Sequence, residues 1–220
     1  MKQRPLPFDS DNPSKPEGTG GSPGAVDGPE CLDEVRRSAV SCQRCKLRQG
    51  ASQVVFGHGH PRARIMLIGE GPGRDEDIQG VPFVGRAGKL LDRILEAAGF
   101  NRDQVYITNV VKCRPPGNRA PTMQEINSCL PWLKRQVSLV DPYLILLLGR
   151  TPAQALLGSG VAISRVRGRW HSWEGYMILP TYHPAALLRD PSKKVPTWKD
   201  VQELLRAYGE LGLGGKSGHA

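Results

Sequence analysis

The spacing of the cysteines in this sequence is compatible with a metal site. Cys42 and Cys45 form a Cys-x2-Cys pair, and Cys113 and Cys129 follow far downstream. The fifth cysteine, Cys31, stands apart. An odd number of cysteines without a sign of export argues against a disulfide framework. No histidine lies at a matching spacing, so the set permits either a four-cysteine zinc site or a [4Fe–4S] cluster.

A glycine- and proline-rich stretch at residues 68–77, Ile-Gly-Glu-Gly-Pro-Gly-Arg-Asp-Glu-Asp, is the second feature with chemical potential. Its glycines allow the backbone to approach a ligand closely. The stretch lacks the Gly-Lys-Ser/Thr of a P-loop, and Arg74 stands where a dinucleotide fingerprint has its third glycine. Acidic residues behind the glycines would repel a pyrophosphate. The loop therefore suits a neutral ligand and a cationic intermediate better, which weakens the hypothesis of a nucleotide-binding enzyme.

The elements that must position these residues alternate between strands and helices. Hydrophobic periodicity predicts helices at residues 32–40, 85–98, 122 to about 137, 151–157 and 195–209. It predicts strands at residues 64–69, 104–111 and 143–148, and a hairpin or strand pair at 170–173 and 176–180. This alternation indicates an α/β fold with a parallel sheet covered by helices on both faces.

Three unusual loops follow the predicted strands. Residues 69–83 follow the first strand, residues 109–120 the second, and residues 183–189 the last. Ligand sites of open α/β sheets lie beyond the carboxyl ends of the strands. We therefore expect the three loops to meet at one crevice.

Length and charge set further limits. The 220 residues carry 30 Lys+Arg and 21 Asp+Glu, a formal net charge of +9 that favours a polyanionic partner. No apolar run approaches the roughly 18 residues of a membrane span, and a secretory signal is not recognisable. We expect a cytoplasmic protein with no membrane partner. Residues 1–30, rich in Pro, Gly and Ser, predict a disordered tail, residues 31–210 one domain, and residues 211–220 a flexible end.

Four motifs occur in order along the chain: Gly-Glu-Gly-Pro-Gly at 69–73 with the acidic run 75–77, Pro-Phe-Val-Gly at 82–85, Asn-Val-Val-Lys-Cys-Arg-Pro-Pro at 109–116, and His-Pro-Ala-Ala-Leu-Leu-Arg at 183–189. Together they resemble the family-4 uracil-DNA glycosylases, the iron–sulfur branch of that superfamily. The resemblance runs from about Cys31 to Tyr208. It implies a three-layer α/β/α sandwich around a four-stranded parallel sheet. It also implies hydrolysis of the N-glycosidic bond of uracil in DNA, which leaves an abasic site for base-excision repair.

The resemblance gives three loop residues a role at the uracil. Phe83 would stack on the extruded ring, and the Asn109 amide would read its O4/N3 edge against cytosine. His183 would donate to the uracil O2, where negative charge develops. The alternatives are a core phenylalanine, a turn asparagine and a surface histidine.

The acids of the first loop would serve the water and the sugar cation. An aspartate of the better-known branch stands where this chain has Gly71, so Glu70 or an acid of 75–77 must take over its task. Glu76 matches the family position that crowds the uracil C5 face and excludes thymine. Gly69 and Gly71 would contact the substrate. A solvated charge run is the alternative for residues 75–77.

The family resemblance also bears on metal and DNA. It favours a structural [4Fe–4S] cluster on Cys42, Cys45, Cys113 and Cys129. Arginines near the predicted crevice would neutralise phosphates; they are Arg114, Arg119, Arg165, Arg167, Arg169 and Arg189. Leu187 or Leu188 would fill the gap left by the flipped base, unless both are core residues.

We expect a monomer that acts on uracil-containing DNA in the cytoplasm, associated with the nucleoid. The basic stretch 114–124 contains no histidine, which speaks against the covalent trap of another branch of the superfamily. A cysteine-metal nucleic-acid-binding module without catalysis is the rival hypothesis. It would leave Glu70, Asn109 and His183 without a purpose.

Overall fold

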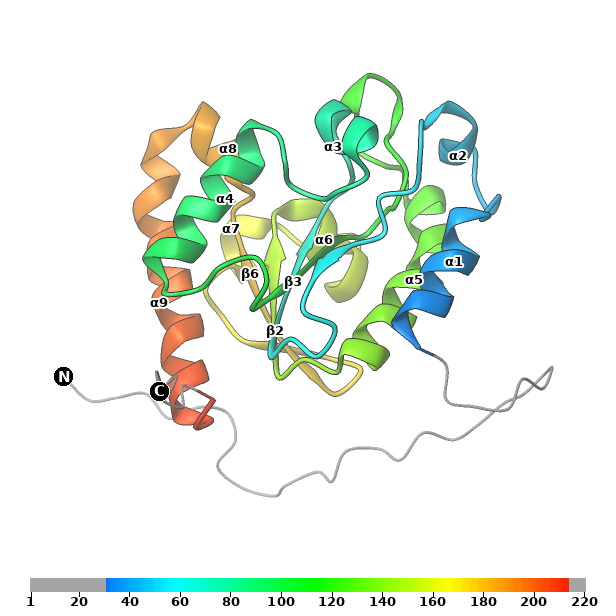
Figure 1. Ribbon diagram of the computed structural model, residues 1–220. Helices are drawn as coiled ribbons and strands as arrows, with labels where there is room; N and C mark the ends of the chain where they lie inside the picture. The colour runs from blue at the N-terminus through cyan, green and yellow to red at the C-terminus, as the bar shows by residue number, and fades with distance from the viewer. Residues whose placement is uncertain (1–30, 214–220) are drawn as a thin grey trace.

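One mixed sheet organises the protein, and its strand order is β1-β3-β2-β4-β6-β5 (Figure 1). The computed structural model describes residues 31–213, so the predicted tail at 1–30 and residues 214–220 lie outside the described part. Four neighbouring strands are mutually parallel: β3 (Tyr106–Asn109), β2 (Ile65–Gly69), β4 (Leu144–Leu148) and β6 (Tyr176–Thr181). The predicted α/β class with a central parallel sheet is confirmed.

The central strands are apolar runs because both faces of the sheet are covered. All five residues of β2 and all five of β4 are buried. Leu67 of β2 lies beside Ile107 of β3 on one side and Leu146 of β4 on the other. Successive side chains point to opposite faces, so each of these strands contributes to two separate cores.

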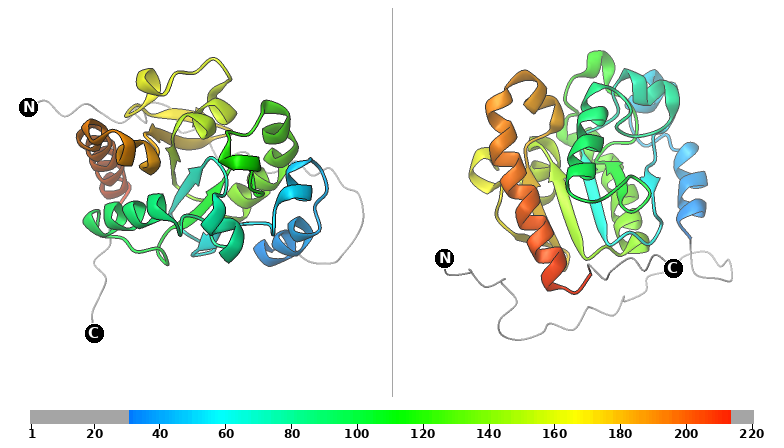
Figure 2. Two further views of the ribbon diagram at one scale, coloured as in Figure 1. Left: turned by 90° about the horizontal axis from the view of Figure 1, so that it is seen from above. Right: turned by 60° about the vertical axis from the view of Figure 1, so that its left-hand side comes forward.

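The two cores lie on opposite sides of the sheet (Figure 2). On one side, Met66 and Ile68 pack with residues of α1 (Leu32–Val40), α5 (Met123–Val140) and α6 (Arg150–Leu157). On the other side, Ile65 and Leu67 pack with residues of α4 (Arg86–Ala97) and α9 (Lys194–Glu210). The predicted three-layer arrangement follows from this alternation.

Two short antiparallel strands close the edges of the sheet. β5 (His171–Trp173) pairs with β6 across a turn at Glu174 and Gly175, whose φ angles are 48° and 84°. Two consecutive positive φ angles are typical of a type I′ hairpin turn, which explains the predicted strand pair. β1 (His58–Gly59) pairs with β3 at the other edge. It was not predicted, because two residues leave no periodic signal.

Several helices were predicted closely, and α5 differs at its end. Thr122 accepts a hydrogen bond from the Glu125 amide, and Glu125 accepts one from the Thr122 amide, a capping box that starts α5. The helix continues to Val140, beyond the predicted 137, because Val137 and Val140 prolong its buried face. It ends at Asp141 in the left-handed conformation, with φ 51°.

The predicted loops contain short helices of their own. α3 (Arg74–Gln79) lies within the first loop, and α8 (Pro184–Arg189) fills the last one. Both lie at the edge of the sheet that is at the top of Figure 1. Two further short helices are α2 (Leu47–Gly50) and α7 (Ile163–Val166), and two 3-10 turns span Pro116–Asn118 and Pro191–Lys193. None of the described helices has the length and apolar character needed to cross a bilayer.

Candidate active site

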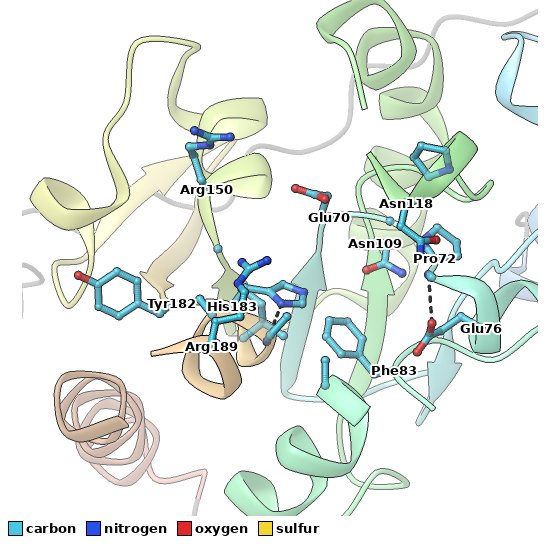
Figure 3. A pocket seen from close by; sticks show the side chains of 18 of the residues that line it. Glu70, Pro72, Glu76, Phe83, Asn109, Asn118, Arg150, Tyr182, His183 and Arg189 are labelled. Atoms are coloured by element: carbon cyan, nitrogen blue, oxygen red, sulfur yellow. Dashed lines mark hydrogen bonds between the residues drawn. The ribbon is translucent and has the colours of Figure 1, made fainter. Parts of the chain in front are cut away.

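The three predicted loops meet at a cleft beyond the carboxyl ends of the parallel strands (Figure 3). The cleft has a volume of about 640 Å³, and it is lined by residues that follow β2, β3, β4 and β6. β2 and β4 are neighbours in the sheet, whereas β3 flanks β2 on its other side. The cleft therefore lies where the chain reverses its direction of winding, the usual ligand site of such sheets.

Asn109 ends β3 at the bottom of the cleft. It is 2% exposed, and its Oδ1 is buried and accepts no hydrogen bond from the described residues. A Cβ atom on Gly69 would lie 2.4 Å from this oxygen and 2.5 Å from the Phe83 ring, so only glycine fits there. A buried amide oxygen without a partner costs about 1–3 kcal/mol. A ligand that donates a hydrogen bond would offset that cost.

Phe83 forms the neighbouring wall. It is 5% exposed and has a φ of 55°, which a bulky side chain rarely adopts. The Arg102 guanidinium donates to the carbonyl oxygens of Phe83, at 2.9 Å, and of Pro82. Such a conformation persists only where surrounding contacts impose it. These contacts present the ring to the cleft (Figure 3).

Glu76 fixes the backbone that follows Phe83. Its Oε1 accepts hydrogen bonds from the amides of Val84 and Gly85, both at 2.9 Å. Its Oε2 accepts one from the amide of Gly73, at 3.0 Å, which caps α3. Glu76 lines the cleft, but both of its carboxylate oxygens are engaged with the backbone. Its contacts serve to position the turn that carries Phe83.

The other two acids of the predicted charge run differ from each other. Asp77 is 3% exposed and accepts hydrogen bonds from the amide and the hydroxyl of Ser52, at 3.0 and 2.9 Å. It ties the first loop to the segment after α2. Asp75 is exposed and does not line the cleft. Within residues 75–77, only Glu76 lines the cleft.

His183 follows β6 and caps the start of α8. Its Nδ1 accepts a hydrogen bond from the Ala185 amide at 3.1 Å. Burial and, to a smaller extent, the Arg189 cation lower the pKa of His183 to about 4, and Glu76 opposes the shift. The imidazole is therefore neutral at pH 7. Because Nδ1 is an acceptor, the proton lies on Nε2, which is the available donor.

Glu70 is the first residue after β2, and its side chain lines the cleft between Asn109 and Arg150 (Figure 3). It is partly exposed, and its Oε2 accepts a hydrogen bond from the hydroxyl of Thr151. Gly71 also lines the cleft. A Cβ atom on Gly71 would lie 2.6 Å from Val111 Cγ2, so an aspartate does not fit at this position.

Four of the five cysteines line one small cavity; they are Cys42, Cys45, Cys113 and Cys129. Cys113 and Cys129 are buried, whereas Cys42 and Cys45 are partly exposed. Burial and, to a smaller extent, the neighbouring thiols raise the pKa of the Cys113 thiol to about 12. Cys31 is exposed at the start of α1 and does not line this cavity. In residues 31–213, no three potential ligands are close enough to hold a single metal ion.

Comparisons with known proteins identify the family. The model of the Uracil DNA glycosylase superfamily matches residues 56–206. The chain belongs to this superfamily. It is 45% identical over 184 residues to a Type-4 uracil-DNA glycosylase of Saccharolobus solfataricus, covering 80% of this chain and 83% of that protein.

Two other relatives from different branches of the superfamily differ in their similarity to this chain. A Type-4 uracil-DNA glycosylase of Thermotoga maritima is 42% identical over 76% of this chain and 88% of its own length. A Type-5 uracil-DNA glycosylase of Pyrobaculum aerophilum is 29% identical over 70% of this chain and 83% of its own length. The identity is thus higher with the Type-4 enzymes. The family resemblance inferred from the four motifs is confirmed.

Among the predicted DNA-contacting arginines of this superfamily member, Arg119 and Arg189 line the cleft. Arg119 donates two hydrogen bonds to the Glu125 carboxylate, whereas Arg189 is exposed at the end of α8. The Arg167 side chain is 20% exposed and forms an ion pair with the buried Asp200, so it packs against α9. The Nε of Arg114 donates to Asn118 Oδ1 at 2.7 Å. These two arginines have partners within the protein.

The two leucines of α8 that the sequence offers as a wedge differ in exposure. Leu187 is 2% exposed and belongs to the interior, where it cannot enter a DNA duplex. Leu188 is 39% exposed. Neighbouring positions of a helix point in different directions, so only one of the two leucines faces solvent.

Sequence reasoning missed a buried lysine beside Asn109. Lys112 is 2% exposed, and its Nζ donates to Thr108 Oγ1 and to the Asn109 carbonyl oxygen, both at 2.6 Å. It also donates to Gln136 Oε1 on α5. Burial lowers its pKa to about 7. The charge within the apolar run 110–113 is the sequence signal that marks it.

Proposed function

We propose that this protein hydrolyses the N-glycosidic bond of uracil in DNA and leaves an abasic site for base-excision repair. The observation that carries the proposal is the buried, unpaired Oδ1 of Asn109 at the bottom of the cleft. Uracil presents an N3–H donor beside the O4 acceptor, and one carboxamide complements both. Cytosine presents the reverse pattern, so it would leave the amide mispaired.

The position of the cleft requires the base to leave the duplex. Asn109 is buried at the carboxyl end of β3, where a stacked base cannot reach it. Enzymes that act on a base extrude it into a pocket and read its edge by hydrogen bonds. Phe83 offers the aromatic surface on which the uracil ring stacks. This contact offsets part of the moderate cost of unstacking the base from DNA.

His183 stabilises the leaving uracil anion. As the glycosidic bond breaks, negative charge develops on the uracil O2. The neutral imidazole keeps Nδ1 engaged with the Ala185 amide and directs the Nε2 proton outward. A fixed donor at a developing anion commonly contributes about 10²–10³-fold in rate.

Glu70 acts on the sugar. Its carboxylate stabilises the oxocarbenium-like sugar by its negative charge and orients the attacking water. Its position at the end of β2 places it on the same cleft as Asn109 and His183. The water adds its oxygen to the anomeric carbon, and a proton leaves for the carboxylate or the solvent.

Cys42, Cys45, Cys113 and Cys129 hold a structural [4Fe–4S] cluster in this proposal. Support comes from the common cavity that the four thiols line, and from the motifs shared with the iron–sulfur branch. Such a cluster would supply covalent cross-links only, since glycosidic hydrolysis needs no redox step. The cysteines would then join the segment after α1 to α5 and to the loop behind Asn109.

DNA lies against the rim of the cleft. Arg150, Arg189 and Lys193 line it and supply positive charge for the phosphates on either side of the flipped nucleotide. Leu188 fills the gap in the base stack. In this proposal the enzyme acts as a monomer.

The experiment is incubation with an oligonucleotide that contains one uracil, followed by alkali. A glycosylase leaves an abasic site, which alkali cleaves into two fragments. The same oligonucleotide with thymine or cytosine in place of uracil is the control. A protein that binds both oligonucleotides without producing fragments would be the non-catalytic binding module instead.

A further inference from the structure

Thr151 holds the carboxylate of Glu70 from the first turn of α6. Its hydroxyl donates a hydrogen bond to Oε2 of Glu70. Thr151 is 6% exposed, so this hydroxyl is shielded from competing water. In residues 31–213, no other side chain donates to the Glu70 carboxylate, and its Oε1 accepts no hydrogen bond.

The turn between β4 and α6 fixes the place of Thr151. Gly149 caps the helix with a φ of 101°, which favours glycine, and its amide donates to the Thr181 carbonyl oxygen at 2.9 Å. A Cβ atom on Gly149 would lie 2.9 Å from the Cβ of His183. The start of α6 is therefore packed between the end of β6 and Glu70.

We propose that Thr151 is a positioning residue for the hydrolytic step, an inference that rests on the proposed role of Glu70. A glutamate side chain has several rotatable bonds, and a partly exposed one samples many orientations. By engaging Oε2, the Thr151 hydroxyl selects one orientation. The other oxygen, Oε1, is then left for the water and the sugar.

The neutrality of the donor is part of the argument. An arginine or lysine in this position would pair with the carboxylate and cancel much of its negative charge at the sugar cation. A hydroxyl orients the carboxylate and leaves that charge intact. The amino-terminal end of α6, from which Thr151 projects, also favours a negative side chain.

Thr151→Val tests this role because it removes the hydroxyl and keeps the shape. We expect the single-turnover cleavage rate to fall about tenfold, the usual effect of one hydrogen bond to a charged group. Affinity for DNA with an uncleavable abasic-site analogue should stay unchanged. Thr151→Ser, which keeps the donor, should restore most of the rate.

Thr197→Val is the matched control. Thr197 lies on α9, is 3% exposed, and its hydroxyl donates to the Lys193 carbonyl oxygen at 2.8 Å. Its substitution removes a buried helix hydroxyl, and this hydroxyl does not contact Glu70. We expect the wild-type cleavage rate for this variant, measured below the unfolding temperature of each protein.

A double-mutant cycle with Glu70→Ala decides whether the two residues act together. If Thr151 acts through Glu70, adding Thr151→Val to Glu70→Ala should change the rate less than about twofold. An additional tenfold loss in the double variant would overturn the inference and leave the role of Glu70 intact. A wild-type rate for Glu70→Ala alone would instead overturn the proposed role of Glu70.

Discussion

The imidazole of His183 lies against the ring of Phe83, with ring centroids 5.5 Å apart and an interplanar angle of 28°. The two residues come from loops that follow β6 and β2. A separation of 5.5 Å leaves no room for a third ring between them. If Phe83 and His183 act as proposed, uracil lies beside this pair, with one face on Phe83 and its O2 near the edge of the imidazole.

His183→Ala should separate chemistry from binding. We expect the single-turnover rate to fall about 10²–10³-fold, because the donor to the uracil anion is lost. Affinity for an abasic-site analogue should change little, since that analogue carries no uracil. A variant that cleaves at the wild-type rate would reassign the loop at 183–189 to DNA contact alone.

Asn109→Asp should change specificity as well as rate. The carboxylate only accepts hydrogen bonds, so the contact with the uracil O4 is lost and cleavage should fall about 10²-fold or more. The same carboxylate accepts from the cytosine amino group, and we expect weak release of cytosine. Rates on matched uracil and cytosine oligonucleotides measure both effects. A lower rate on the uracil oligonucleotide without any release of cytosine would contradict the proposed reading of the O4/N3 edge.

The low pKa of His183 predicts a specific pH dependence of stability. The folded pKa of about 4 lies below the usual 6.5, so between these values the unfolded chain binds a proton that the folded protein does not. The stabilisation from this residue is therefore complete above about pH 6.5 and is lost as the pH falls towards 4. His183→Asn should abolish that part of the pH dependence, as measured by denaturant unfolding from pH 4 to pH 7. Identical pH profiles of both proteins would contradict the assignment.

Metal content should distinguish the predicted ligand cysteines from Cys31. Anaerobically purified protein should be brown, with broad absorbance near ~400 nm. Cys45→Ser should lose iron and colour and should unfold at lower temperature, whereas Cys31→Ser should keep all three properties. Iron and zinc analysis of the same samples gives the independent readout. A colourless protein that contains zinc and lacks iron would exclude the cluster.

Arg189 should contribute to DNA binding, whereas Arg167 should not. Arg189→Ala should reduce the slope of log K against log salt by about 0.9, the contribution of one neutralised phosphate. Arg167→Ala should leave that slope unchanged but destabilise the fold by about 3 kcal/mol, because the buried Asp200 loses its ion-pair partner. A smaller salt slope for Arg167→Ala would show that its guanidinium reaches DNA.

The strands and long helices were predictable because burial on a repeating face leaves a periodic pattern. The bounds of α1 match the prediction, and β4 is a continuous apolar run, as expected of a strand covered on both sides. Short helices were not predictable. Glu76 of α3 also accepts a hydrogen bond from the Val84 amide beyond the helix, a contact that a local pattern does not contain.

The site was predictable where a motif names a residue, and it was not where a distant partner decides. The sequence places Asn109 and His183 after strands, and the strand order brings them together. It gives no sign that Arg167 pairs with Asp200 or that Thr151 contacts Glu70. These contacts arise only when the chain has folded back on itself.

The strand order also makes catalytic activity a test of complete folding. Asn109 ends β3 and Glu70 follows β2, both in the first half of the chain, whereas His183 and Thr151 follow β6 and β4, in the second half. A fragment that ends before β4 carries Asn109 and Glu70 but no group for the departing uracil. A proteolytic cut between the halves should abolish uracil release once they part, even where each half retains its helices. During synthesis, the enzyme should become active only after α8 has left the ribosome and docked.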